Sequence, residues 1–239
     1  WSSSMDLQRA LEVAVAAARE AAAHLQADFH RPAGPRGKID KAPADTEAEE
    51  RIRARLLAAF PEWGYLGEET GGQDGAAGAP IWLVDPNDGT RDYLRGQRGS
   101  AVAIGLVHAG RPVLGVVLPF SYPDDQGRLY AWAEGCGPLT CDGLPVTARL
   151  PERLGPLDVV LNSSASDRAP SANLDCLAPG RYRAVPSIAH RLALVASGEA
   201  AGATSLYAPG AWDLAAGHAL VRGAGGALLD QHGREVTYD

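Results

Sequence analysis

Apolar residues recur at three- and four-residue steps in two segments near the start of the chain. Over residues 6–29 this spacing predicts an amphipathic helix with one buried face. The segment "HRPAGPRGKIDKAP" at 30–43 is rich in Pro, Gly and basic residues and predicts a loop. A second helix is predicted from Asp45 or Thr46 to about Phe60, because both residues are good N-caps.

Short apolar runs bounded by Gly, Pro and polar residues predict strands along the rest of the chain. The first group of strands lies at about 81–85, 101–107, 112–118 and 128–133, with a hairpin turn at 108–111. The second half is predicted to hold strands near 157–162, 182–185 and 203–207, helices over 187–198 and 212–226, and a closing hairpin at 227–237. Helices and strands therefore mix throughout, which predicts a layered α/β or α+β sandwich.

Length and composition set the class of protein. The chain has 239 residues, enough for one large domain or two closely packed lobes. With 46% hydrophobic and 21% charged residues, it is expected to be soluble and globular. No apolar run approaches the roughly 20 residues that span a bilayer, and the N-terminus lacks the basic region and apolar core of a signal peptide. Residues 1–4 precede Met5 and are left out of these interpretations.

Charge and cysteine content narrow the possible functions. The formal net charge of −7 argues against nucleic-acid binding. An anionic substrate would therefore need local positive charge, which bound cations can supply. Cys136, Cys141 and Cys176 form an odd, sparse set whose spacing suits no zinc site. They predict a reducing, cytoplasmic location without a disulfide framework.

The stretch "IWLVDPNDGTRDY" at 81–93 runs from apolar residues directly into carboxylates, an amide and a hydroxyl. A calcium-binding EF-hand would need Gly and Glu where the sequence has Thr90 and Gly96. An aspartyl-phosphate motif would need a nucleophile at Pro86, which cannot attack. An ordinary turn rich in Asp, Pro, Asn and Gly stays open as an alternative.

A two-metal hydrolase is the third chemical interpretation of this stretch, beside the ordinary turn. Asp85 at a strand end and Asp88 offer carboxylates, and residue 87 offers its backbone carbonyl, which are the oxygen ligands that Mg²⁺ prefers. Gly89 and Thr90 offer backbone N–H groups and a hydroxyl to a phosphate if a helix begins there.

More carboxylates occur in suitable settings elsewhere in the chain. "GEET" places Glu68 and Glu69 before a Gly-rich loop, where adjacent carboxylates are costly unless solvated or bound to a cation. Asp213 lies at a predicted helix start, as does Asp45. For Asp213 and Asp45, simple N-capping is the alternative to a functional role.

Four blocks together resemble the inositol monophosphatase family. They are "GEET" at 67–70, "WLVDPNDGT" at 82–90, "WDLAAG" at 212–217 and "GAGGALLD" at 223–230. This Mg²⁺-dependent, lithium-sensitive phosphomonoesterase superfamily also holds fructose-1,6-bisphosphatases and bisphosphate nucleotidases. The resemblance implies an alternating α/β/α/β/α sandwich, a homodimer, and a single domain over 5–239. Within it, a metal-site lobe would cover about 5–150 and a substrate lobe about 151–239.

The resemblance also implies a role for each matching residue. Glu68, Asp85 and the Asn87 carbonyl would hold one ion, Asp85, Asp88 and Asp213 a second, and Glu68 would support a third. The ions would be Mg²⁺, with Mn²⁺ as an alternative. Thr90 and Asp45, together with Glu68, would form the catalytic group, in which Thr90 and Asp45 orient the attacking water. The N–H groups of Gly89 and Thr90 would bind the phosphate.

The substrate side departs from the inositol-specific pattern. Leu206 stands where those enzymes have an acidic residue that contacts the cyclitol hydroxyls, and a nearby acidic position holds Ala201 or Gly202. Either Lys38 or Lys41 could reach a phosphate. "DGTRDY", with Arg91, is closer to the "DGTKEF" type of bisphosphate nucleotidases. Further candidate substrate contacts are Arg168, Ser187, His190, Arg191 and Tyr207.

We therefore expect a Mg²⁺-dependent phosphatase of a small phosphorylated metabolite, such as a sugar or cyclitol phosphate or a nucleotide. A 3′,5′-bisphosphate nucleotidase and a histidinol-phosphate phosphatase stay open as alternatives. A non-catalytic metal- or nucleotide-binding relative is the alternative from another class. Neither a nucleic acid nor a membrane is an expected partner.

Overall fold

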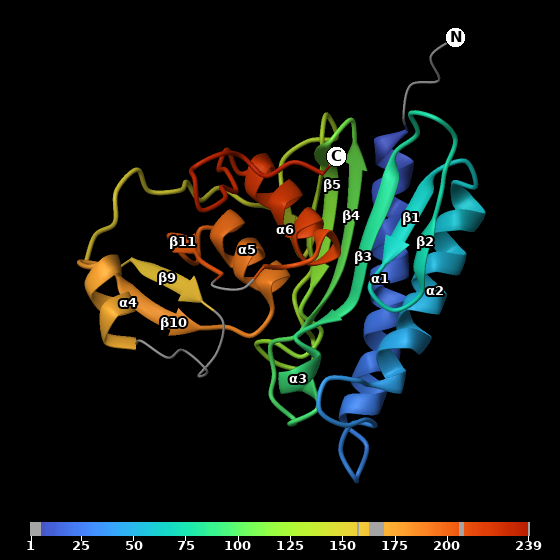
Figure 1. The fold of residues 1–239 in the computed structure, drawn as a ribbon, viewed down its shortest axis with the longest axis horizontal. Helices are drawn as coiled ribbons and strands as arrows, with labels where there is room; N and C mark the ends of the chain where they lie inside the picture. Colours follow the sequence, from blue (N-terminus) through green and yellow to red (C-terminus); the bar gives the residue numbers. More distant parts are fainter. Residues whose placement is uncertain (1–5, 157, 163–169, 206–207, 239) are drawn as a thin grey trace.

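The computed structural model describes residues 6–156, 158–162, 170–205 and 208–238, and within these it forms five layers (Figure 1). Helices α1 (Leu7–Phe29) and α2 (Pro43–Ala59) form the first layer, and an eight-stranded sheet forms the second. Helices α5 (Ile188–Ala196) and α6 (Ala211–Gly223) lie between this sheet and a three-stranded sheet, and α4 (Pro170–Leu177) lies on the outside. The predicted α/β/α/β/α sandwich is confirmed.

The eight-stranded sheet is antiparallel except where β1 pairs with β3, and its strand order is β2-β1-β3-β4-β5-β6-β7-β8. Its strands are β1 (Gly64–Gly67), β2 (Gly71–Gln73), β3 (Ile81–Asp88), β4 (Ala101–His108), β5 (Arg111–Leu118), β6 (Tyr130–Ala133), β7 (Thr140–Cys141) and β8 (Leu144–Pro145). The predicted strands and the turn at 108–111 are confirmed, but β3 runs three residues further than predicted, to Asp88.

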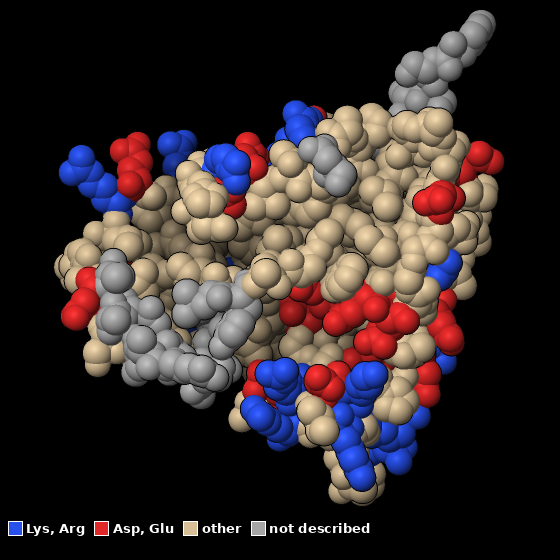
Figure 2. Space-filling model, in the orientation of Figure 1, with Lys and Arg blue, Asp and Glu red and all other residues tan. Residues whose placement is uncertain are grey.

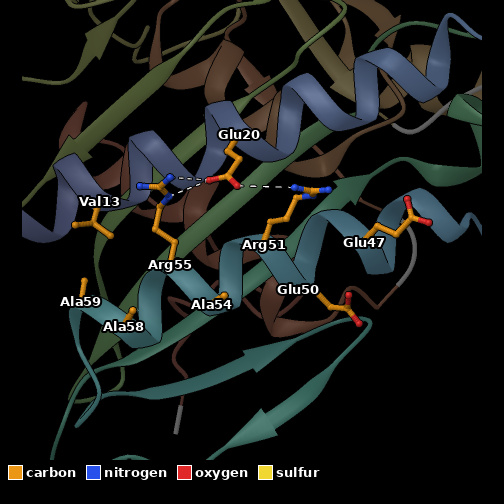
Figure 3. Close-up of a pocket in the computed structure, with 9 residues that line it drawn as sticks. All are labelled: Val13, Glu20, Glu47, Glu50, Arg51, Ala54, Arg55, Ala58 and Ala59. Atoms are coloured by element: carbon orange, nitrogen blue, oxygen red, sulfur yellow. Dashed lines mark hydrogen bonds and ion pairs between the residues drawn. The ribbon is translucent and has the colours of Figure 1, made fainter.

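Helices α1 and α2 cover one face of the large sheet. Small residues line the buried side of α1, which lets α2 pack closely alongside it. On the outer surface, Glu20 of α1 pairs with Arg55 at 2.7 Å and lies 4.0 Å from Arg51 (Figure 3). Helix α2 begins at Pro43, earlier than predicted, because proline suits a first-turn position where no amide donor is needed. Asp45 is therefore in the first turn and is not the N-cap.

Helix α6 rests directly on the opposite face of the large sheet. Gly105 of β4 and Gly115 of β5 are paired neighbours, and both lie under Ala216 of α6. A Cβ on Gly105 would come within 2.7 Å of the Ala216 nitrogen, and one on Gly115 would collide with the Ala216 carbonyl. These two glycines thus allow the close approach that fixes α6, with Asp213 in its first turn, against the sheet.

The smaller sheet is fully parallel, with β9 between β10 and β11. Its strands are β9 (Val159–Asn162), β10 (Arg181–Ala184) and β11 (Gly202–Ala203). Helix α4 lies between β9 and β10 in the sequence and starts at a proline. The closing hairpin is reduced to one bridge between Leu229 and Glu235. In the part of the chain that the structure describes, no helix is long and apolar enough to cross a membrane.

Candidate metal centre

Strand β3 carries its polar residues into the site through a bulge. Asp85 pairs with Ala103 of β4 and Asp88 pairs with Ala101, so three residues of β3 step against two of β4. In a regular strand, residues two apart share a face and residues three apart do not. The extra residue in the bulge offsets this alternation, so Asp85 and Asp88 are both directed to the same face of the sheet. The amide of Asn87 donates to Asp85 Oδ1 at 2.9 Å and fixes the Asp85 carboxylate.

Glu68 and Asp213 join Asp85 from other elements. Glu68 follows β1, which runs parallel to β3, so both strands end at the same edge of the sheet. Asp213 lies in the first turn of α6, where its Oδ2 accepts from the amide of Gly210 at 2.7 Å. One carboxylate oxygen from each of Glu68, Asp85 and Asp213 lies within 4.8 Å of the other two. Residues far apart in the sequence therefore converge on one point.

Asp88 is tied to the start of α5. Its Oδ2 accepts from Ser187 Oγ at 2.6 Å and from the amide of Ala189 at 2.7 Å. Ser187 is also the N-cap of α5, because its Oγ accepts from the amide of His190 at 2.9 Å. We call Glu68, Asp85, Asp88 and Asp213 the acidic centre. Figure 2 shows acidic side chains gathered on the face of the molecule where β3 ends in Figure 1.

Asp45 reaches the same strand end from the α2 side. The Asp45 carboxylate is 1% exposed. Its Oδ1 accepts from Asn87 Nδ2 at 2.9 Å, and its Oδ2 accepts from Thr90 Oγ1 at 2.7 Å. Gly89 has a φ of 104°, which favours glycine, and it turns the chain from β3 into α3 (Thr90–Tyr93). The predicted pair of Asp45 and Thr90 is thus in direct contact.

Glu49 holds the loop that carries Glu68, a role that sequence reasoning missed. Its buried carboxylate accepts from the amides of Glu69 and Thr70, both at 2.8 Å. A Cβ on Gly67 would collide with this carboxylate, so a larger residue there would displace Glu49. The one available signal was its position one helical turn after Asp45.

The acidic centre has the electrostatics of a cation site. Burial raises the pKa of Asp45 and of Asp213 to about 7. Partial removal from water, reinforced by neighbouring carboxylates, raises the pKa of Glu68 to about 7. Burial also raises the pKa of Asp85 and Asp88, and for Asp85 the charge of Asp88 adds to the effect. Such a cluster stays charged at neutral pH only with compensating positive charge, and its all-oxygen donors fit a hard divalent cation.

Comparison with known proteins gives the family. The pattern of the inositol monophosphatase family matches residues 6–239. The chain belongs to this family. It is 32% identical to an inositol-1-monophosphatase of Mesorhizobium japonicum, over 96% of this chain and 88% of the relative. It is 30% identical to the 3′(2′),5′-bisphosphate nucleotidase CysQ of Escherichia coli, over 84% of this chain and 81% of the relative.

Solved structures of the family have the same fold. An inositol monophosphatase from Anabaena (Nostoc) superposes with a TM-score of 0.75 at 28% identity, covering 92% of this chain and 83% of that one. As a member of the inositol monophosphatase family, the protein is a phosphoric monoester hydrolase that acts on small phosphorylated substrates. The family is metal-dependent, and Glu68, Asp85 and Asp213 could together hold a metal ion.

Three exposed cations are carried by the loop after α1 and by α3. Lys38 and Lys41 form a tight turn, in which the Lys38 amide donates to the Lys41 carbonyl at 3.1 Å. This turn packs on α3, because a Cβ on Gly37 would lie 3.0 Å from the Leu94 side chain that follows α3. Arg91 is exposed on α3 itself. We call Lys38, Lys41 and Arg91 the basic rim. None of the three pairs with a carboxylate among the described residues.

Figure 2 shows basic side chains gathered below the acidic ones, where Figure 1 places α3 and the loop after α1. The two segments that carry the basic rim therefore lie on the same face of the molecule as these acidic side chains. Lys38 and Lys41 are both exposed, so exposure does not decide which of them could reach a phosphate.

The remaining predicted substrate residues have other settings. His190 is fully buried, with its ring against Tyr122 and Nδ1 3.2 Å from the Gly99 carbonyl. Arg191 is also buried and donates to the Val185 carbonyl at 2.7 Å. Both side chains therefore lie inside the protein, and their contacts with substrate stay predictions. Ser187 uses its hydroxyl on Asp88. The predictions for Arg168, Leu206 and Tyr207 lie outside the described residues.

Proposed function

We propose that the protein is a Mg²⁺-dependent phosphatase in which Asp45 and Thr90 orient a water that attacks the phosphomonoester of a small metabolite. One observation carries the proposal. Glu68, Asp85 and Asp213 bring their oxygens within 4.8 Å of one another, at the strand end that also holds the Asp45–Thr90 pair. A phosphoryl-transfer site needs this combination of clustered charge and a positioned nucleophile.

The acidic centre and the Asn87 carbonyl are the proposed ligands of two or three ions. When bound, divalent cations would neutralise the phosphate and activate the attacking water. Their all-oxygen surroundings suit Mg²⁺, and Mn²⁺ would fit the same donors. The hydrogen bonds to Asp85, Asp88 and Asp213 hold these carboxylates in place before any ion arrives.

The Asp45–Thr90 pair would position and deprotonate the water. The Thr90 hydroxyl donates to Asp45 Oδ2, so its oxygen lone pairs are left to accept a proton of the water. As the water oxygen bonds to phosphorus and the ester P–O bond breaks, the water proton passes to Thr90 and the Thr90 proton passes to Asp45. The leaving alkoxide takes a proton from solvent water and departs as the alcohol, and Asp45 later returns its proton to solvent. The amides of Gly89 and Thr90 would bind the phosphate where the chain enters α3.

A second candidate function is hydrolysis of a 3′,5′-bisphosphate nucleotide. The specific support is the basic rim, whose three cations are exposed without carboxylate partners among the described residues, on segments that share a face with the acidic side chains. A second anionic group on the substrate would pair with them. The related CysQ of Escherichia coli is named for this activity. Histidinol phosphate, which lacks a second phosphate, would use the basic rim less.

A phosphate-release screen tests the function. The substrates are inositol 1-phosphate, sugar phosphates, nucleoside monophosphates, a 3′,5′-bisphosphate nucleotide and histidinol phosphate, each with Mg²⁺, with Mn²⁺, and with chelator. We expect release that requires the divalent cation and is inhibited by Li⁺. Release of phosphate from no ester under any of these conditions would favour a non-catalytic family member.

Assembly, location and domain division also stay predictions. We propose a homodimer, which light scattering of the purified protein would test, and a cytoplasmic location, which rests on cysteine usage alone. The division into lobes at about residue 150 also rests on the family resemblance. In the structure, α6 from the second half packs on β3, β4 and β5 from the first, so the two halves share a buried interface.

A further inference from the structure

We propose that the side-chain amide of Asn87 is a positioning residue that fixes the Asp45 carboxylate for water orientation. The inference rests on the proposed function, because Asn87 would act only through Asp45. It concerns the side chain, whereas the family resemblance assigns residue 87 only a backbone carbonyl. A side chain with no such role could be apolar at this position without changing that carbonyl.

The bulge in β3 separates the directions of its polar side chains. Asp85 and Asp88 are directed to the α5 and α6 face, where Asp213 and Ser187 meet them. The side chain of Asn87 instead meets Asp45 of α2, which covers the opposite face. One strand end thus supplies ligands to one side and a single amide to the other.

The contact is short and closed to solvent. Asn87 Nδ2 lies 2.9 Å from Asp45 Oδ1, and both residues are 1% exposed. The other carboxylate oxygen of Asp45 accepts from Thr90 Oγ1 at 2.7 Å. With each oxygen held by a different donor, the plane of the Asp45 carboxylate is fixed relative to the Thr90 hydroxyl. Reversing the Asn87 amide would set two oxygens against each other, so the donor must face Asp45.

The chain retains this amide at an energetic cost. Asn87 Oδ1 is buried and has no hydrogen-bond partner among the described residues. An unpaired buried acceptor is costly, because it has given up its hydrogen bonds to water without a replacement. A leucine of similar volume would remove that cost and would keep the backbone carbonyl. The hydrogen bond to Asp45 is the interaction in the structure that offsets the cost, which points to a role in holding Asp45.

The test compares Asn87→Leu with wild-type enzyme on the best substrate of the phosphate-release screen. We expect kcat to fall about tenfold to hundredfold, as when a reacting group loses its alignment. We expect KM and the half-saturating Mg²⁺ concentration to change less than about threefold, because the variant keeps every proposed metal ligand and phosphate donor. Gln97→Leu, which removes an exposed amide after α3, serves as the matched control and should match wild type.

A double-mutant cycle separates positioning from general damage. If Asn87 acts through Asp45, adding Asn87→Leu to Asp45→Ala should cause no further loss of kcat. A further measurement needs no turnover: the Asn87 side-chain amide resonances in nitrogen-15 NMR spectra should shift in Asp45→Ala. This shift keeps the inference testable even if Asn87→Leu folds poorly.

The outcomes are distinguishable. A wild-type enzyme that is inactive on every ester overturns the proposed function. An active wild type with an unchanged Asn87→Leu variant overturns only the role of Asn87. Three other results would also overturn the role of Asn87. They are additive losses of kcat in the double mutant, a rise in half-saturating Mg²⁺ as large as the fall in kcat, and Asn87 amide resonances that do not shift in Asp45→Ala.

Discussion

The acidic centre and the basic rim belong to segments on one face of the molecule but are held in different ways. Asp85, Asp88 and Asp213 each accept hydrogen bonds that fix their carboxylates, and Glu68 sits on a loop fixed by Glu49. The cations of the basic rim are exposed and have no carboxylate partner among the described residues. Charges that are already positioned can contribute strongly to a reaction, whereas mobile exposed charges contribute little. The difference predicts a graded series of mutational effects.

The largest effect is expected in the acidic centre, for Asp88→Asn. The substitution keeps the shape of the side chain but removes its charge, and it leaves an amide where Ser187 and Ala189 now donate. We expect Mg²⁺-dependent phosphate release to fall at least about a thousandfold, the scale for losing charge stabilisation at reacting atoms. Asp213→Asn should behave alike. Phosphate release over a Mg²⁺ series measures both.

The control for these variants is Asp74→Asn, an exposed carboxylate beyond β2. Circular dichroism and thermal unfolding should show that all three variants keep the fold. Near-normal turnover by either Asp88→Asn or Asp213→Asn would show that the carboxylate replaced is not needed for Mg²⁺-dependent phosphate release.

Much of the acidic centre could be predicted because its residues are grouped along the chain. Asp85, Asn87, Asp88 and Thr90 fall within six consecutive positions, and a strand end followed by a turn holds them together. The bulge that divides these side chains between two faces of the sheet was not visible, because it depends on pairing with β4. The layered fold could be predicted from the alternation of helices and strands, which follows from local periodicity.

Features that depend on packing between distant parts of the chain could not be predicted. The role of Glu49 was not visible in the sequence, because the loop that it holds lies about 20 positions away. The burial of His190 and Arg191 was not visible either, because charged and polar residues are mostly exposed. Instead they lie in the interior, where α5 packs between α6 and the smaller sheet.

An intermediate effect is expected for Glu49→Gln, one step removed from the acidic centre. Glutamine keeps the length of the side chain but presents an NH₂ group to amides that now meet a carboxylate. The loop with Glu68 should loosen. We expect a tenfold to roughly hundredfold rise in half-saturating Mg²⁺, the usual range for a group that orients a metal ligand. A Mg²⁺ titration of activity measures it.

Glu50→Gln is the matched control, since the next residue of α2 is exposed. An unchanged Mg²⁺ requirement in Glu49→Gln, with normal unfolding temperature, would mean that the loop needs no carboxylate to hold it. A uniform loss of stability in place of a Mg²⁺ effect would assign Glu49 to folding alone.

The smallest effects are expected in the basic rim, from Lys41→Ala and Arg91→Ala. Each exposed pair with a substrate anion is worth about 0.2–1 kcal/mol, so KM should rise only up to about fivefold. The rise should appear for a 3′,5′-bisphosphate nucleotide and be absent for the matching monophosphate, because only the former has a second anion to pair. Arg19→Ala, an exposed cation on α1, controls for net charge. Added salt should erase the difference, since exposed charges are screened. Equal changes for both substrates would place the basic rim on the reacting phosphate itself, and the preference for a second anion would lose its support.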